Sequence, residues 1–84
     1  MSKNRRLAWA CRRGMLELDV LLGNFFHEAY PQLSAEDQAL FADLLDCDDP
    51  DLADWLLGNV PPPNETITGI TGKIRDHAKS RFHT

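Results

Sequence analysis

Cysteine is scarce in this sequence of 84 residues, and the two that occur, Cys11 and Cys47, lie far apart. Long apolar runs are also missing, since the longest near-apolar stretch reads VLLGNFF, far short of the roughly 20 residues that span a bilayer. The N-terminal MSKNRRLAWACRR has no apolar leader region. These absences argue against a disulfide framework and against insertion into a membrane. We therefore expect free thiols in a reducing compartment.

Lysine and arginine are absent from residues 14–65, which carry twelve acidic residues instead. Five basic residues precede this segment and four follow it, so the formal net charge of −4 conceals blocks of opposite sign. Such blocks can neutralise one another within a small fold, or they can present a polarised surface to a partner. Because the chain is net acidic and has no recognisable nucleic-acid motif, we do not expect it to bind nucleic acid.

β-Branched residues are sparse before residue 66, and no stretch alternates strictly between apolar and polar residues, so no strand is predicted. Apolar residues recur at helical spacing instead. A chain of this length forms one small domain and cannot enclose a large cavity. We expect an all-α fold, a small single-domain five-helix bundle over residues 1–84. The expected helices span residues 4–13, 15–30, 34–46, 50–57 and 65–80, followed by a frayed tail at 81–84.

Polar residues and prolines mark the expected helix ends. The N-caps are expected at Asn4, Ser34, Asp49 and Asn64, and Pro31 is expected to end the second helix. Gly14 is expected to follow the first helix in a left-handed backbone conformation. The apolar stripes predict a core of Leu7, Ala8, Cys11, Leu18, Leu21, Leu22, Phe25, Phe26, Ala29, Tyr30, Leu40, Phe41, Leu44, Leu45, Leu52, Trp55, Leu56, Ile67, Ile70, Ile74, Ala78 and Phe82.

No residue set with the spacing of a catalytic, metal or cofactor site is found. The acidic DCDDPD has Asp51 and Leu57 where a calcium loop requires glycine and glutamate. The three histidines have no metal-ligand spacing, the cysteines form no C-x-x-C pair, and no glycine-rich phosphate loop follows a strand. We therefore expect no enzyme, no metal and no tightly bound cofactor.

The segment CRRGMLELD, residues 11–19, places two arginines before a glycine and two acids after it. One interpretation is a helix corner, in which Gly14 separates two helices and Arg13 reaches Glu17 locally. The other is a binding surface, because an exposed glycine permits close approach of a partner and charged neighbours offer strong hydrogen bonds. The residues alone favour neither interpretation.

A family resemblance bears on this choice. RRGMLELD, residues 12–19, resembles the R-G-x-x-E motif of the succinate dehydrogenase flavinylation factors, called succinate dehydrogenase assembly factor 2 in mitochondria. The similarity extends to WACRRGMLELD, to the FF at 25–26, to the L-S-x-x-D at 33–37 and to LLDCDDPDLADWL at 44–56. It covers most of residues 7–58 and is far more specific than an isolated R-G-x-x-E.

The resemblance implies a five-helix assembly factor, which we expect to be a monomer when free. The absence of an N-terminal transit peptide favours the bacterial cytoplasm, although a mature mitochondrial form would look similar. The implied partner is the flavoprotein subunit of succinate dehydrogenase, with that of fumarate reductase as a second client. FAD would become covalently attached to the partner and would not be bound tightly by this chain. An antitoxin that opposes a membrane-bound toxin is the alternative function. The implied partner-binding residues are Arg12, Arg13, Gly14, Met15, Glu17 and, by proximity, Asp19.

Overall fold

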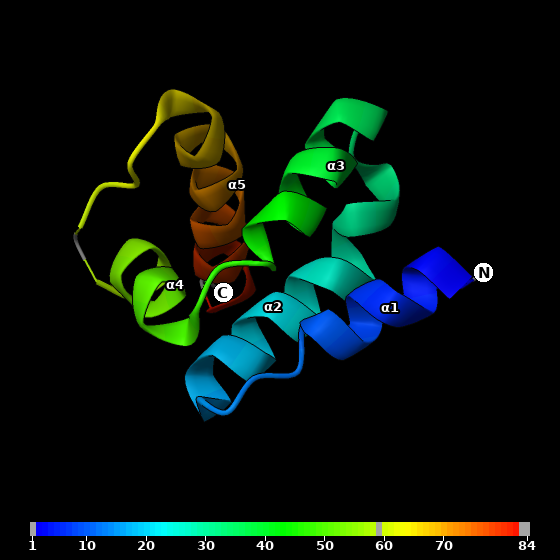
Figure 1. Cartoon of the computed structure of the whole chain (residues 1–84), viewed down its shortest axis with the longest axis horizontal. Coiled ribbons are helices and arrows are strands. Elements are labelled where there is room, and N and C mark those ends of the chain that lie inside the picture. Colours follow the sequence, from blue (N-terminus) through cyan, green and yellow to red (C-terminus); the bar gives the residue numbers. More distant parts are fainter. Residues whose placement is uncertain (1, 59, 83–84) are drawn as a thin grey trace.

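The computed structural model describes residues 2–58 and 60–82, and the side chains of residues 5–58 and 60–81. The described chain is entirely helical and has no strand, which confirms the expected all-α fold with five α-helices (Figure 1). The helices are α1 (Ser2–Ala10), α2 (Leu16–Glu28), α3 (Ala35–Leu44), α4 (Asp49–Leu56) and α5 (Glu65–Phe82), with a 3-10 turn, η1 (Tyr30–Gln32), between α2 and α3.

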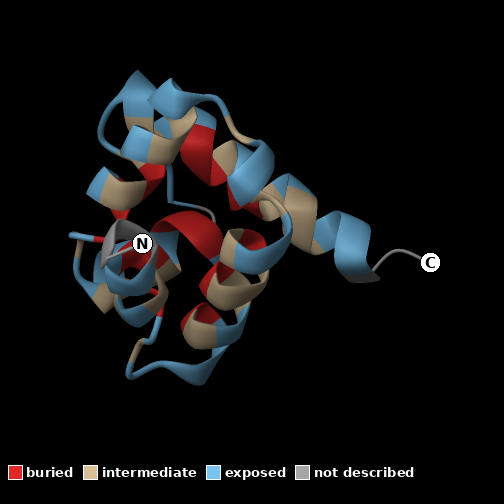
Figure 2. Ribbon diagram, turned by 90° about the vertical axis from the view of Figure 1, so that its right-hand side faces the viewer, coloured by how far each residue is buried: buried red, intermediate tan, exposed pale blue. Residues whose placement is uncertain are grey.

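Helix α5 is the central element, because α2, α3 and α4 all pack against it. Figure 1 shows α3 and α4 on opposite sides of α5, with α1 beside α2 on the remaining side. The last turns of α5 extend beyond the rest of the molecule (Figure 2). The body of the protein is therefore packed around the first part of α5, and its C-terminal part projects.

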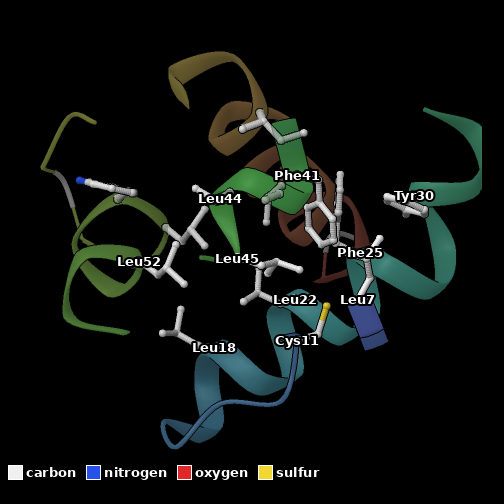
Figure 3. Packing of buried hydrophobic residues seen from close by; sticks show 14 residues of the cluster. Leu7, Cys11, Leu18, Leu22, Phe25, Tyr30, Phe41, Leu44, Leu45 and Leu52 are labelled. Carbon is white, nitrogen blue, oxygen red and sulfur yellow. The ribbon is translucent and has the colours of Figure 1, made fainter. Parts of the chain in front are cut away.

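The core is built from apolar side chains at helical spacing on all five helices (Figure 3). Phe41 lies at its centre, with ring centroids 5.3 Å from Phe25 and 5.6 Å from Tyr30. Leu7 and Cys11 bring α1 and the residue that follows it onto this core. Each such leucine or phenylalanine contributes about 1.5–3 kcal/mol by leaving water. The buried members are Leu7, Cys11, Leu18, Leu22, Phe25, Tyr30, Phe41, Leu44, Leu45, Leu52, Trp55, Leu56, Ile70 and Ile74.

Most of the predicted core is thus confirmed. Several predicted members pack against it while half-buried: Leu21, Phe26, Ala29, Leu40 and Ile67. Ala8 and Ala78 are half-buried, and the side chain of Phe82 lies outside the described residues.

Two of the expected caps are confirmed. The Ser34 hydroxyl accepts a hydrogen bond from the Asp37 amide at 3.1 Å, and Asn64 Oδ1 accepts one from the Ile67 amide at 2.9 Å. Each side chain satisfies an amide that the first helical turn leaves without an intrahelical acceptor.

The other expected boundaries differ from the structure. Helix α1 begins at Ser2, so Asn4 lies inside it and does not cap it. The N-cap of α4 is Asp48, and Asp49 is the first helical residue. Helix α2 ends at Glu28, before the expected Pro31, because residues 30–32 tighten into the 3-10 turn. At the C-terminus α5 includes Arg81 and Phe82, and the rest of the expected frayed tail, 83–84, lies outside the described residues.

Among the described side chains, three ion pairs join the basic ends of the sequence to its acidic middle. Arg13 pairs with Asp49, Lys73 pairs with Asp37, and Arg81 pairs with Glu28. Neutralisation within the fold therefore accounts for part of the charge pattern. Arg5, Arg6 and Arg12 are exposed and take part in no ion pair among the described side chains.

Candidate partner-binding surface

Residues 11–15, here termed the corner, connect α1 to α2. Helix α1 ends at Ala10, and the Arg12 amide donates to the Trp9 carbonyl at 3.0 Å, which closes the last turn. Met15 is the N-cap of α2 in extended conformation, and its carbonyl accepts from the Asp19 amide at 3.0 Å. Since a methionine side chain cannot cap the helix, Glu17 and Asp19 in the first turn provide the negative charge that favours a helix N-terminus.

Within the corner Cys11 is buried in the core, and Arg13 is half-buried, with 14% of its side chain exposed. Its Nη1 lies 3.3 Å from the Cys47 carbonyl oxygen and 3.4 Å from Asp49 Oδ1, and its Nη2 donates to the Leu45 carbonyl. The expected local contact with Glu17 is therefore wrong. Arg13 reaches across the fold to the loop between α3 and α4.

These contacts have a clear physical basis. Leu45 is the C-cap of α3, and the last carbonyls of a helix have no intrahelical donor and carry partial negative charge. A guanidinium offers five N–H donors in a fixed fork, so it can satisfy carbonyls and a carboxylate at once. The Nε of Arg13 is buried and has no hydrogen-bond partner among the described residues. The corner is thus held against the α3–α4 loop by charge-assisted hydrogen bonds.

The exposed residues of the corner are Arg12, Gly14 and Met15, and Glu17 follows them on the surface. Asp19 is half-buried. The structure therefore brings four of the six predicted residues to one exposed segment, while Arg13 lies beneath it and Asp19 at its edge.

Trp9 belongs beside this segment, although the motif does not include it. Its side chain is 66% exposed, and the Arg12 guanidinium carbon lies 5.4 Å from the ring centroid. A cation over an indole face is attracted by the ring quadrupole, and exposed tryptophans are common energetic centres of interfaces. The sequence signal is its position, since Leu7 and Cys11 face inward and leave Trp9 on the outer side of α1.

Gly14 does not adopt the expected left-handed conformation, because no described glycine has a positive φ. A Cβ built on Gly14 would lie 3.8 Å from Asp49 Oδ2, which is an ordinary van der Waals contact. The fold itself can therefore accommodate a side chain here. A helix-corner role does not explain the glycine, whereas an external surface that approaches the backbone closely would.

Neither cysteine is set up as a nucleophile. Burial raises the pKa of Cys11 to about 11, against the opposing influence of Arg13. Burial also raises the pKa of Cys47, assisted by the nearby carboxylates of Asp51 and Asp46. Both thiols are free and stay protonated near neutral pH, and a protonated thiol is a poor nucleophile.

Among the described residues, no group of three histidine, cysteine or acidic side chains is placed to hold a metal ion. His77 instead pairs with Glu28 at 3.0 Å. No helix of the described chain has the length and apolarity needed to cross a membrane. Together with the adjoining Trp9 and Glu17, the corner offers an exposed backbone, two charges of opposite sign, a thioether and an indole, a set suited to protein recognition.

A family model described as "Flavinator of succinate dehydrogenase" matches residues 5–78, which include the whole corner. A protein of Aliivibrio fischeri named FAD assembly factor SdhE is 45% identical over 77 residues, covering 92% of this chain and 90% of that protein. Another of the same name, from Idiomarina loihiensis, is 56% identical over 67 residues, covering 80% of this chain and 74% of that protein.

A solved structure agrees with this relationship. The solution structure of a UPF0350 protein superimposes with a TM-score of 0.77 at 40% sequence identity, covering 96% of this chain and 87% of that protein. The resemblance that the sequence motifs indicated is therefore confirmed along nearly the whole chain, including the C-terminal helix, for which the motifs were less distinctive.

Proposed function

Because the chain belongs to the family of flavinators of succinate dehydrogenase, we propose that it binds the flavoprotein subunit of that enzyme and promotes covalent attachment of FAD to it. The observation that carries the proposal is the match over residues 5–78, together with relatives named FAD assembly factor that align over about nine-tenths of their length. The flavoprotein subunit of fumarate reductase is proposed as a second client.

The proposed contribution of this chain is positioning. The residues that form and break bonds belong to the flavoprotein, and this chain holds that subunit in a productive arrangement. The protonated thiols and the lack of a metal-binding cluster among the described side chains support a binding role. In this proposal FAD is not bound tightly by the chain itself, which acts as a monomer in the bacterial cytoplasm.

The corner is the proposed contact with the client. Gly14 lets the client backbone approach, Met15 supplies apolar contact, and Arg12 and Glu17 form charged hydrogen bonds with it. Arg13 acts indirectly, because its guanidinium is occupied by the α3–α4 loop and sets the shape of the exposed residues. Asp19 contributes at the edge of the surface.

The test is covalent flavin fluorescence of the flavoprotein subunit on a denaturing gel, in a host that lacks its own factor. The natural chain should restore the fluorescent band, and Glu17→Ala should reduce it. Glu36→Ala is the matched control, because Glu36 is also an exposed acid in the first turn of a helix. Absence of recovery by the natural chain, with client present, would reject the proposal and leave the antitoxin alternative. If Glu17→Ala restores covalent flavin fluorescence as well as the natural chain does, Glu17 is not part of the contact with the client.

A further inference from the structure

An open apolar groove of about 530 Å³ lies between α2, the end of α4 and the last turns of α5. The projecting end of α5 stands off from the body and forms one wall (Figure 2). Its apolar lining comes from three helices: Leu16, Val20, Leu21, Leu56, Leu57 and Ala78.

Several of these side chains are unusually exposed. Leu16 is 71% exposed, Val20 48% and Leu57 45%, and all three line the groove. Single exposed apolar residues are ordinary on protein surfaces, but a contiguous concave set with polar residues around it is typical of a binding site. The volume suits a few side chains of a partner segment.

The charged residues around the groove indicate the sign of the charge that its occupant carries. Arg75 and Lys79 line it on α5 and form no ion pair among the described side chains, whereas Arg81 pairs with Glu28. Glu17 lines it on the α2 side. A segment with carboxylates facing α5 and apolar side chains facing α2 and α4 would match this distribution.

We propose that the groove receives a segment of the client flavoprotein that carries apolar side chains flanked by carboxylates. This inference rests on the proposed function and extends its contact surface from the corner to α4 and α5. The two surfaces are continuous, because the groove residues Leu16 and Glu17 follow Met15, the last residue of the corner. One client can therefore cover the corner and the groove together.

The test compares the affinities of two glutamate variants for the purified flavoprotein subunit. Val20 lies in the groove and Val60 lies outside its lining, and both are 48% exposed, so Val20→Glu and Val60→Glu are matched in chemistry and exposure. We expect Val20→Glu to weaken binding roughly tenfold or more and Val60→Glu to leave it unchanged. Val20→Lys should lose less affinity than Val20→Glu, because it attracts carboxylates. Circular dichroism would verify that all variants fold.

The outcomes separate this inference from the proposed function. If the natural chain fails to bind the flavoprotein, the proposed function fails, and the groove inference fails with it. If the natural chain binds and Val20→Glu binds equally well, only the groove inference is overturned. A natural chain that sediments as a dimer and becomes a monomer on Val20→Glu would assign the groove to self-association and overturn it. Val20-dependent retention on anionic phospholipid vesicles, without an effect on flavoprotein affinity, would also overturn it.

Discussion

The Arg13 guanidinium lies 3.4 Å from the carboxylate of Asp49, so the residue that precedes the corner glycine is tied to the first residue of α4. The same side chain donates to two carbonyls of the intervening loop. An arginine in the motif thus acts within the fold, while its neighbour Arg12 faces outward. We therefore expect substitutions of these two adjacent arginines to differ in their effect on stability.

Arg13→Ala should lower the free energy of unfolding by about 1–3 kcal/mol, because it leaves two carbonyls and the Asp49 carboxylate without their charged donor. Arg12→Ala should change it by less than about 0.5 kcal/mol, because Arg12 is exposed. Urea denaturation of both variants measures the difference. Equal stability of the two variants would contradict a structural role for Arg13.

Gly14→Ala should leave the protein as stable as the natural chain, or more stable by up to about 1 kcal/mol. The reason is that the backbone has no positive φ there and the added methyl meets only an ordinary contact. Flavinylation of the client should nevertheless fall, and fall further with Gly14→Arg. Thermal unfolding and the flavin gel measure the two effects separately. A loss of stability that parallels the loss of flavinylation would return Gly14 to a helix-corner role.

We expect the ionised Glu28 carboxylate to stabilise the folded protein, and we expect this contribution to be lost in acid. The hydrogen bond from Arg81, with a smaller contribution from His77, lowers the pKa of Glu28 from its ordinary value of 4.5. Since the folded pKa is the lower one, the stabilisation is complete above the unfolded value and disappears as the pH falls through the folded value. Glu28→Gln should therefore destabilise the protein at pH 7 and have no effect well below pH 4.5.

Urea denaturation of Glu28→Gln at both pH values, in low and high salt, measures this contribution. The effect at pH 7 should shrink in high salt because the pair is exposed. Glu65→Gln, an exposed glutamate in the first turn of α5, is the control. If Glu28→Gln changed the free energy of unfolding equally at both pH values, the ionisation of Glu28 would not be the source of its contribution to stability.

We expect the protein to lose stability in base because of the buried Cys11 thiol. Its pKa is raised from 9.0 to about 11 by burial, so the folded protein retains the thiol proton over a range in which the unfolded chain releases it. The corresponding stabilisation is complete below pH 9 and is lost as the pH rises towards about 11. Cys11→Ala should weaken this pH dependence. Unfolding measured from pH 7 to 11 under reducing conditions tests it, and an unchanged slope in Cys11→Ala would exclude Cys11 as its source.

The helical periodicity was sufficient to predict the fold, because the same apolar spacing that reveals a helix also reveals the face it buries. Leu18, Leu22 and Phe25 lie on such a face and are fully enclosed. The helix ends were harder to predict, since a capping residue type permits a cap without requiring one. Ser34 and Asn64 cap their helices. Asn4 instead lies inside α1, and Asp49 is the first residue of α4 and pairs with Arg13.

The motif predicted which residues meet at the corner, but not which of them face outward. The helix-corner interpretation paired Arg13 with Glu17, because the two residues are close in the sequence. Its actual partners lie 32 to 36 residues further along the chain, and two of them are backbone carbonyls, which leave no signature in a sequence. The groove was beyond prediction for the same reason, because its lining is assembled from three helices.

The long-range contacts of Arg13 also set an order of events during synthesis. The corner leaves the ribosome early, yet all three of its acceptors belong to residues 45–49 and are translated more than thirty residues later. A nascent chain that ends before Leu45 has the R-G-x-x-E residues without the loop that shapes them. The exposed residues of the corner can therefore take up their arrangement only after the α3–α4 loop has been made.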